Sequence, residues 1–179
     1  YFIDNEDYFN RRQMAADEKG VEYTDNGERA IFFARGVLET VKKLRWQPDV
    51  IVCQGWVSAV VPFYIKTAYA DEPSFANSKV ILSLYTNELK GNLGDHFKRC
   101  VEFRDAKQEL LTDYKDDFDF TELGKMAIDY SDGVIESEKD ASAVLLDYAK
   151  EKNKPVLLYP GEDFSDAYKT FINEVCPDE

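Results

Sequence analysis

The chain has 179 residues, a length that suits one domain with a sizeable core and is short for two full α/β domains. Hydrophobic residues make up 44% of the sequence and aromatic residues 14%, which excludes wholesale disorder. The net charge of −13 disfavours nucleic acids and anionic membranes as partners, because both require a basic face. No apolar run approaches the ~20 residues that span a bilayer.

The cysteines and the histidine limit which kinds of metal, disulfide and catalytic site the chain can form. Cys53, Cys100 and Cys176 are an odd number without metal-ligand spacing, which indicates reduced thiols and a cytoplasmic location. His96 is the single histidine, in a charged stretch, and both a surface role and a catalytic base remain open for it. With one histidine and no cysteine cluster, the sequence predicts no metal site. Gly-rich phosphate fingerprints are absent, and no cofactor is expected.

Apolar periodicity, taken in chain order, predicts strands that alternate with helices. The expected strands cover 1–3, 49–53, 79–85, 133–135 and 155–159, and the expected helices cover 26–44, 58–68, 120–130, 141–150 and 165–175. Asp25 or Asn26 is the expected N-cap of the first helix. The charged segment 91–119 is expected at the surface, with short helical stretches near 98–101 and 105–111.

This alternation predicts the α/β fold class: a three-layer sandwich around a parallel, Rossmann-like sheet, with helices on both faces. The expected strand 49–53 contains a continuous apolar run from 50 to 53, which is typical of a strand buried in a parallel sheet. No linker or repeat divides the sequence, so we expect one domain over 1–179. The strand at 1–3 suggests that the chain starts inside this domain, and the acidic, proline-containing end after 165–175 looks like a natural terminus.

One candidate site follows from chemistry alone. Cys53, Gln54, Gly55 and Trp56 come directly after a predicted strand and before a predicted helix. Ligands bind at that carboxyl edge in open α/β sheets. Gly55 permits a tight backbone, Gln54 offers an amide, and Trp56 offers a stacking face. An ordinary strand–helix turn with Trp56 as a core anchor explains the same residues, and both interpretations remain open.

Several long motifs resemble the glycogen/starch synthase family of glycosyltransferases. They are YFIDNEDYF at 1–9, YTDNGER at 23–29, WQPDVIVCQGW at 46–56 with AVVPFY at 59–64, KVILSLYT at 79–86 and AIDYSDGV at 127–134. The resemblance implies the N-terminal domain of a GT-B enzyme, in which two Rossmann-like domains enclose the active site. It also implies nucleotide-glucose and α-glucan as ligands, with retaining glucosyl transfer and no metal.

The sequence departs from the family at the reacting centre. The two histidines of the family's H-D-W-H motif fall on Gln54 and Val57, and its aspartate falls on Gly55. The histidine and asparagine of T-I-H-N fall on Tyr85 and Thr86. The family's K-x-G-G-L loop and its C-terminal domain have no counterpart in these residues. We therefore expect no catalytic residue and no transfer by this chain alone.

The resemblance assigns substrate binding to the remaining polar positions and their replacements: Asp25, Asn26, Gln54, Gly55, Trp56, Tyr85 and Thr86. Three functions remain open: half of a synthase, a degenerate module that binds glucan or a protein without catalysis, and an inherited scaffold that no longer reports function. A protein partner or a homo-oligomer is possible in the second case. The carboxyl edge of the sheet, facing Asp25 and Tyr85, is where we expect a ligand.

Overall fold

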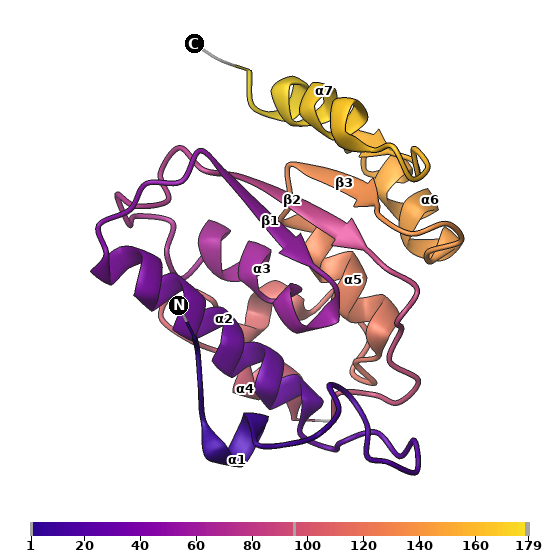
Figure 1. The fold of residues 1–179 in the computed structure, drawn as a ribbon. Helices are drawn as coiled ribbons and strands as arrows, with labels where there is room; N and C mark the ends of the chain where they lie inside the picture. Colours follow the sequence, from indigo (N-terminus) through magenta and orange to yellow (C-terminus); the bar gives the residue numbers. More distant parts are fainter. Residues whose placement is uncertain (1, 95, 178–179) are drawn as a thin grey trace.

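Four parallel strands form the centre of the computed structural model, which describes residues 2–94 and 96–177. They are β1 (Val50–Gln54), β2 (Lys79–Leu84), β3 (Gly133–Glu136) and β4 (Val156–Leu157), hydrogen-bonded in chain order (Figure 1). The predicted parallel sheet is confirmed. Only the last strand is shorter than its apolar run suggests.

The sequential strand order places the intervening helices on one face. Right-handed crossovers between neighbouring parallel strands all fall on the same side of a sheet. Accordingly α3 (Val61–Lys66), α5 (Phe120–Asp129) and α6 (Ala143–Glu151) share one buried core with alternate residues of β2. The long helix α2 (Asn26–Lys43), which precedes β1, contributes Ala30, Ala34 and Leu38 to that core. The predicted helices are confirmed, although the one expected at 58–68 is shorter, since α3 covers 61–66 and the 3-10 helix η1 (Trp56–Ser58) precedes it.

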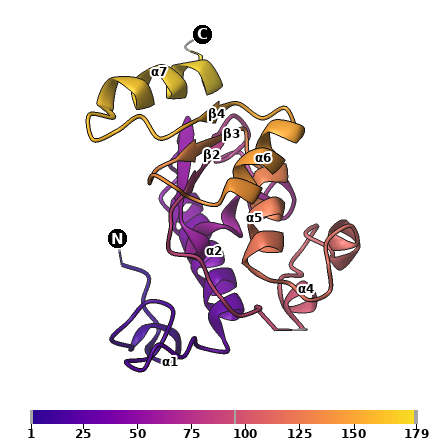
Figure 2. The same cartoon turned by 90° about the vertical axis from the view of Figure 1, so that its right-hand side faces the viewer.

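The opposite face is covered by α7 (Ser165–Val175) over β2 to β4, which completes the three layers. Figures 1 and 2 show α7 on the far side of the strands from α2 and α3. Phe171 and Val175 pack against Ile81 and Ile135 in a second apolar cluster. Gly133 permits this approach, because a Cβ there would lie 2.9 Å from Val175.

Strand β1 is less buried than its apolar run predicts. It pairs only with β2 among the described residues, so its other edge carries no strand there. Cys53 points into the main core at 2% exposure, as expected, whereas Val52 points to the other face and is 41% exposed. The reason is geometric: the apolar cluster beneath α7 includes Val50 at the start of β1 but does not extend to Val52.

The predicted strand at 1–3 is wrong where it can be compared. Tyr1 lies outside the described residues, and Phe2 and Ile3 belong to no strand. The side chain of Ile3 instead packs on α2, within 2.9 Å of where Gly36 would carry a Cβ. A short helix, α1 (Glu6–Phe9), and a polar loop then lead to α2.

Segment 91–119 is anchored more deeply than its charge suggests. It contains α4 (Phe97–Cys100) and the 3-10 helix η2 (Gln108–Leu111). Leu110 is exposed, whereas seven other side chains of the segment are buried in the main core: Leu93, Phe97, Val101, Ala106, Leu111, Tyr114 and Phe118. The charged residues between them dominate the composition and conceal these anchors. In the part of the chain that the structure describes, no helix is long and apolar enough to cross a membrane.

Candidate functional site at the carboxyl edge of the sheet

The carboxyl ends of β1 and β2 meet at a sharp backbone turn. Gln54 lies opposite Ser83 in the parallel register, and the N–H of Gly55 donates to the Ser83 carbonyl at 3.1 Å. Gly55 has φ 68° and ψ −176°, a conformation that is essentially restricted to glycine. The hydroxyl of Ser58 then donates to the Gln54 and Gly55 carbonyls at 2.9 and 3.1 Å. This turn fixes where η1 begins.

Trp56 lies in the core. Its residue exposure is 3%, and it belongs to the main apolar cluster beneath the turn. The indole therefore presents no open face on which a sugar can stack. Of the two interpretations of this motif, the core anchor describes the position of Trp56.

A small cavity of about 20 Å³ lies between the two strand ends. Gly55, Trp56, Ser83, Tyr85 and Asn87 contribute to its lining, together with apolar residues of α5 and α6. A volume of that size holds roughly one water molecule. Ser83 is 1% exposed, and its Oγ is the only buried side-chain polar atom without a hydrogen bond within residues 2–94 and 96–177. An unpaired buried hydroxyl is uncommon and costs stability. Side chains alternate along β2, so Ser83 Oγ lies with Ile81 on the α7 face of the sheet, whereas Leu82 and Leu84 face the cavity.

Of the polar positions that the motif comparison selected, Tyr85 lines the cavity, Gln54 ends β1 and Thr86 follows β2. Gln54 and Thr86 are exposed, and Tyr85 is half-buried. The backbone N–H of Thr86 donates to Glu138 Oε2 at 2.8 Å, and its hydroxyl donates to the same oxygen. These bonds lower the pKa of Glu138. Through these bonds to Glu138, Thr86 links the loop after β2 to the loop after β3.

Asp25 and Asn26 serve a different network. Arg11 donates to both carboxylate oxygens of Asp25 at 2.6 Å, which holds the pKa of Asp25 below its usual range. Asn26 is buried; its Nδ2 donates to the Ala15 carbonyl at 2.8 Å, and its Oδ1 accepts from Arg29 at 2.7 Å. Both residues join the N-terminal loop to α2, and neither lines the edge cavity.

The structure thus brings Gly55, Trp56 and Tyr85 together around the cavity, with Gln54 and Thr86 on the exposed strand ends. It adds Ser83 and Glu138, which the sequence did not select. The single polar residue inside the apolar strand VILSL was a usable indication for Ser83. Glu138 lies 52 residues from Thr86, and no local pattern links the two.

A parallel sheet with helices on both faces and a candidate site at its carboxyl edge defines an α/β domain of the Rossmann-like class. The family model of the starch synthase catalytic domain matches residues 1–154, and the chain belongs to this family.

Glycogen synthases are among its curated relatives. The chain is 43% identical to the glycogen synthase of Vibrio parahaemolyticus over 101 residues, which cover 56% of this chain and 21% of the relative. It is 38% identical to that of Chlorobium limicola over 94 residues, 52% and 19% of the two chains. With the Aeromonas salmonicida protein, identity is 31% over 115 residues, 64% and 24%. The matched stretches therefore span about a fifth of the length of these relatives.

Proposed function

We propose that residues 1–179 form one starch-synthase N-terminal-like domain, acting in the cytoplasm on the ligands of glycogen synthesis, and that this chain alone does not transfer glucose. The family match supports the ligand class, nucleotide-glucose or α-glucan. The parallel sheet supports a ligand site at its carboxyl edge, because ligands of such sheets bind there.

The observation that carries the proposal is the absence of an imidazole from the described edge. Gln54, Val57 and Tyr85 occupy the positions where the family motifs have histidines, and the one histidine of the chain lies against Glu28 on α2. Losing one well-placed donor to developing charge costs roughly 10²–10³ in rate. The turn itself supports the same conclusion, since Gly55 adopts a conformation that would strain the family's aspartate.

A non-catalytic module that binds glucan is the alternative that the edge favours. The cavity of about 20 Å³ is far below the roughly 300 Å³ of typical ligand pockets, so a sugar would lie across the rim and not inside it. Gln54, Tyr85 and Thr86 present amide and hydroxyl groups there. The amide of Gln54 and the hydroxyl of Tyr85 suit the hydroxyls of a neutral glucan, whereas the Thr86 hydroxyl already donates to Glu138.

The first experiment measures transfer from labelled ADP-glucose and UDP-glucose to glycogen. We expect no product above a blank without protein. Product above that blank, lost in Gln54→Ala and retained in Lys169→Ala, would refute the proposal. Lys169 is a matched control because it is exposed on α7 and does not line the edge cavity.

The second experiment titrates ¹⁵N-labelled protein with maltooligosaccharides at millimolar concentration. We expect amide shifts confined to 54–58 and 83–87, weakened by Gln54→Ala and Tyr85→Ala and unchanged by Lys169→Ala. NMR is preferable to tryptophan fluorescence, because Trp56 is buried and Trp46, away from the cavity, is 60% exposed. If no shifts appear, glucan binding is excluded, and sedimentation analysis then tests self-association as the module's role.

A further inference from the structure

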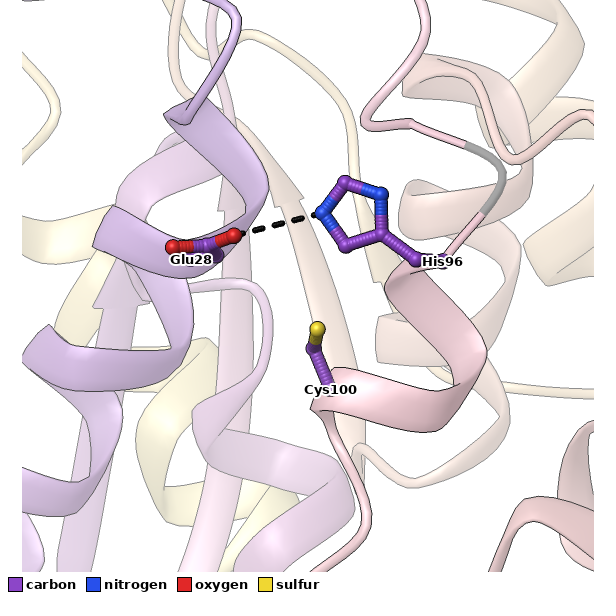
Figure 3. Close-up of side chains that lie close together, drawn as sticks. All are labelled: Glu28, His96 and Cys100. Atoms are coloured by element: carbon purple, nitrogen blue, oxygen red, sulfur yellow. Dashed lines mark hydrogen bonds and ion pairs between the residues drawn. The ribbon is translucent and has the colours of Figure 1, made fainter.

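Three side chains with different metal-binding atoms converge between α2 and α4. Figure 3 shows Glu28 on α2 facing His96, the N-cap of the short helix α4, and Cys100, the last residue of that helix. His96 and Cys100 are four residues apart and therefore lie on one face of that turn. The carboxylate, imidazole and thiol atoms all lie within 4.8 Å of one another, and His96 Nε2 lies 3.2 Å from Glu28 Oε1.

The core holds the two elements in this arrangement. Gly27 has no side chain, and a Cβ there would lie 2.9 Å from both the Leu93 carbonyl and the Phe97 ring. Phe97, the first residue of α4, is 1% exposed and stacks on Phe118 with ring centroids 4.7 Å apart. Helix packing therefore brings together Glu28 and His96, which are 68 residues apart in sequence. No local spacing in the sequence brings these three residues together.

The geometry is close to that of a tetrahedral metal ion. Zinc bonds of about 2.0–2.3 Å to nitrogen, oxygen and sulfur place neighbouring ligand atoms roughly 3.3–3.6 Å apart. The His96–Glu28 separation of 3.2 Å already matches this spacing. The thiol of Cys100 lies within 4.8 Å of both partners, so a rotation about its side chain that closes about 1 Å completes a three-ligand set.

The surroundings supply an orienting group and an open coordination position. Tyr8 Oη donates to Glu28 Oε2 at 3.2 Å, the kind of outer contact that holds a ligating carboxylate in place. A cavity of about 510 Å³ adjoins the cluster, and Glu28 and Cys100 are part of its lining together with Tyr8, Phe32 and Arg35. Three protein ligands beside an open cavity leave the fourth position to water or to a ligand.

We propose that Glu28, His96 and Cys100 bind one divalent transition-metal ion of the zinc class. One imidazole, one thiolate and one carboxylate together suit Zn²⁺ better than the hard ions Mg²⁺ or Ca²⁺. None of the three residues lines the cavity at the sheet edge, so this site is distinct from the proposed glucan site. The metal links α4 to α2 and thereby fixes the start of segment 96–118 against the main core.

The test uses Co²⁺ as a spectroscopic substitute for Zn²⁺ with the reduced, metal-free protein. We expect one Co²⁺ per chain, with the thiolate-to-cobalt band in the near ultraviolet and the intense visible bands of tetrahedral cobalt. Zn²⁺ should abolish both bands, since it binds such sites more tightly than Co²⁺. At about 100 μM protein and metal, the experiment detects dissociation constants up to about 100 μM. Absence of the bands at these concentrations overturns the proposal.

Variants assign the ligands. Cys100→Ser should remove the ultraviolet band and weaken binding at least tenfold, and His96→Asn should weaken it similarly. Tyr8→Phe should keep the band and weaken binding by roughly tenfold, as expected of a positioning residue. Cys176→Ser is the matched control, because Cys176 is the other partly exposed free thiol and lies at the end of α7.

The outcomes separate the metal site from an ordinary ion pair. A charge-transfer band that survives Cys100→Ser, or disappears in Cys176→Ser, overturns the assignment. Circular dichroism of each variant shows whether the fold is retained. A Cys100→Ser protein that keeps its fold and loses the band supports the site, whereas wild-type protein whose melting temperature does not rise with Zn²⁺ contradicts it.

Discussion

The Arg11–Asp25 pair offers a sharp test of what Asp25 does. Arg11 donates to both carboxylate oxygens at 2.6 Å, and the two side chains are 22% and 28% exposed. Asp25 makes no side-chain capping bond to α2, so its replacement removes the pair without removing a cap. The nearby pair of Arg12 and Glu18 belongs to the same loop, but its side chains are 86% and 65% exposed.

Exposure sets the expected magnitudes. A fully exposed pair contributes about 0.2–1 kcal/mol, and hydrogen bonds to charged groups contribute about 1.5–3 kcal/mol when shielded from water. A bidentate pair that is about three-quarters buried falls between these values. We expect Asp25→Ala to lower the free energy of unfolding by about 1.5–2 kcal/mol, and Glu18→Ala by less than about 0.5 kcal/mol. For a chain of this length, the first change lowers the melting temperature by roughly 4–6 °C.

A double-mutant cycle with urea denaturation measures the coupling in each pair. We expect about 1 kcal/mol or more between Arg11 and Asp25 and close to zero between Arg12 and Glu18. Asp25 has a lowered pKa in the folded state, so its stabilisation is present above the unfolded value near pH 4 and is lost as the pH falls further. Equal couplings in the two pairs, or undiminished coupling below the folded pKa, would refute this reasoning.

Three further predictions concern the edge of the sheet. Trp56→Ala should lower the free energy of unfolding by about 3–5 kcal/mol, because Trp56 is 3% exposed. Trp46→Ala should lower it by less than about 0.5 kcal/mol, because Trp46 is 60% exposed. Chemical denaturation measures both values, and similar losses would contradict the core assignment of Trp56. Gly55→Asp should lower the free energy of unfolding by about 1–3 kcal/mol, because the backbone conformation of Gly55 strains any residue with a side chain. Gln54→Asp, at the neighbouring position, should be nearly neutral in the same assay. Cys53 should stay unlabelled by a thiol reagent in native protein while Cys176 reacts, because burial raises the pKa of Cys53 to about 12; rapid labelling of Cys53 would show an open core.

The strands were predictable because their sequences are apolar runs that end at turn residues. Residues 50–54 and 79–84 lie within one or two residues of the expected bounds. The strand at 1–3 failed because apolar character does not provide a pairing partner, and Ile3 packs on α2 in its place. Val52 was expected to be buried for a similar reason: its exposure depends on how far α7 extends, which no local pattern encodes.

The site was less predictable than the fold, because its residues come from separate loops. Motif comparison selected Gly55 and Tyr85, and both line the edge cavity. It also selected Asp25, whose carboxylate is engaged by Arg11 from the preceding loop. Contacts of this kind depend on tertiary placement. The cluster of Glu28, His96 and Cys100 has the same origin, since helix packing brings together residues that the sequence separates.

The backbone sets the shape of this sheet edge, whereas the sequence motifs lead us to expect side chains there that differ from those of the family. The turn at Gly55 is held by bonds from its own N–H to the Ser83 carbonyl and from the Ser58 hydroxyl to two carbonyls. These bonds use the backbone and one hydroxyl, so they do not depend on which side chains occupy positions 54 and 57. Replacement of imidazoles by Gln54 and Val57 can therefore remove proton donors without disturbing the strands. A binding role survives such replacement more readily than catalysis, because binding needs the surface and catalysis needs the donors.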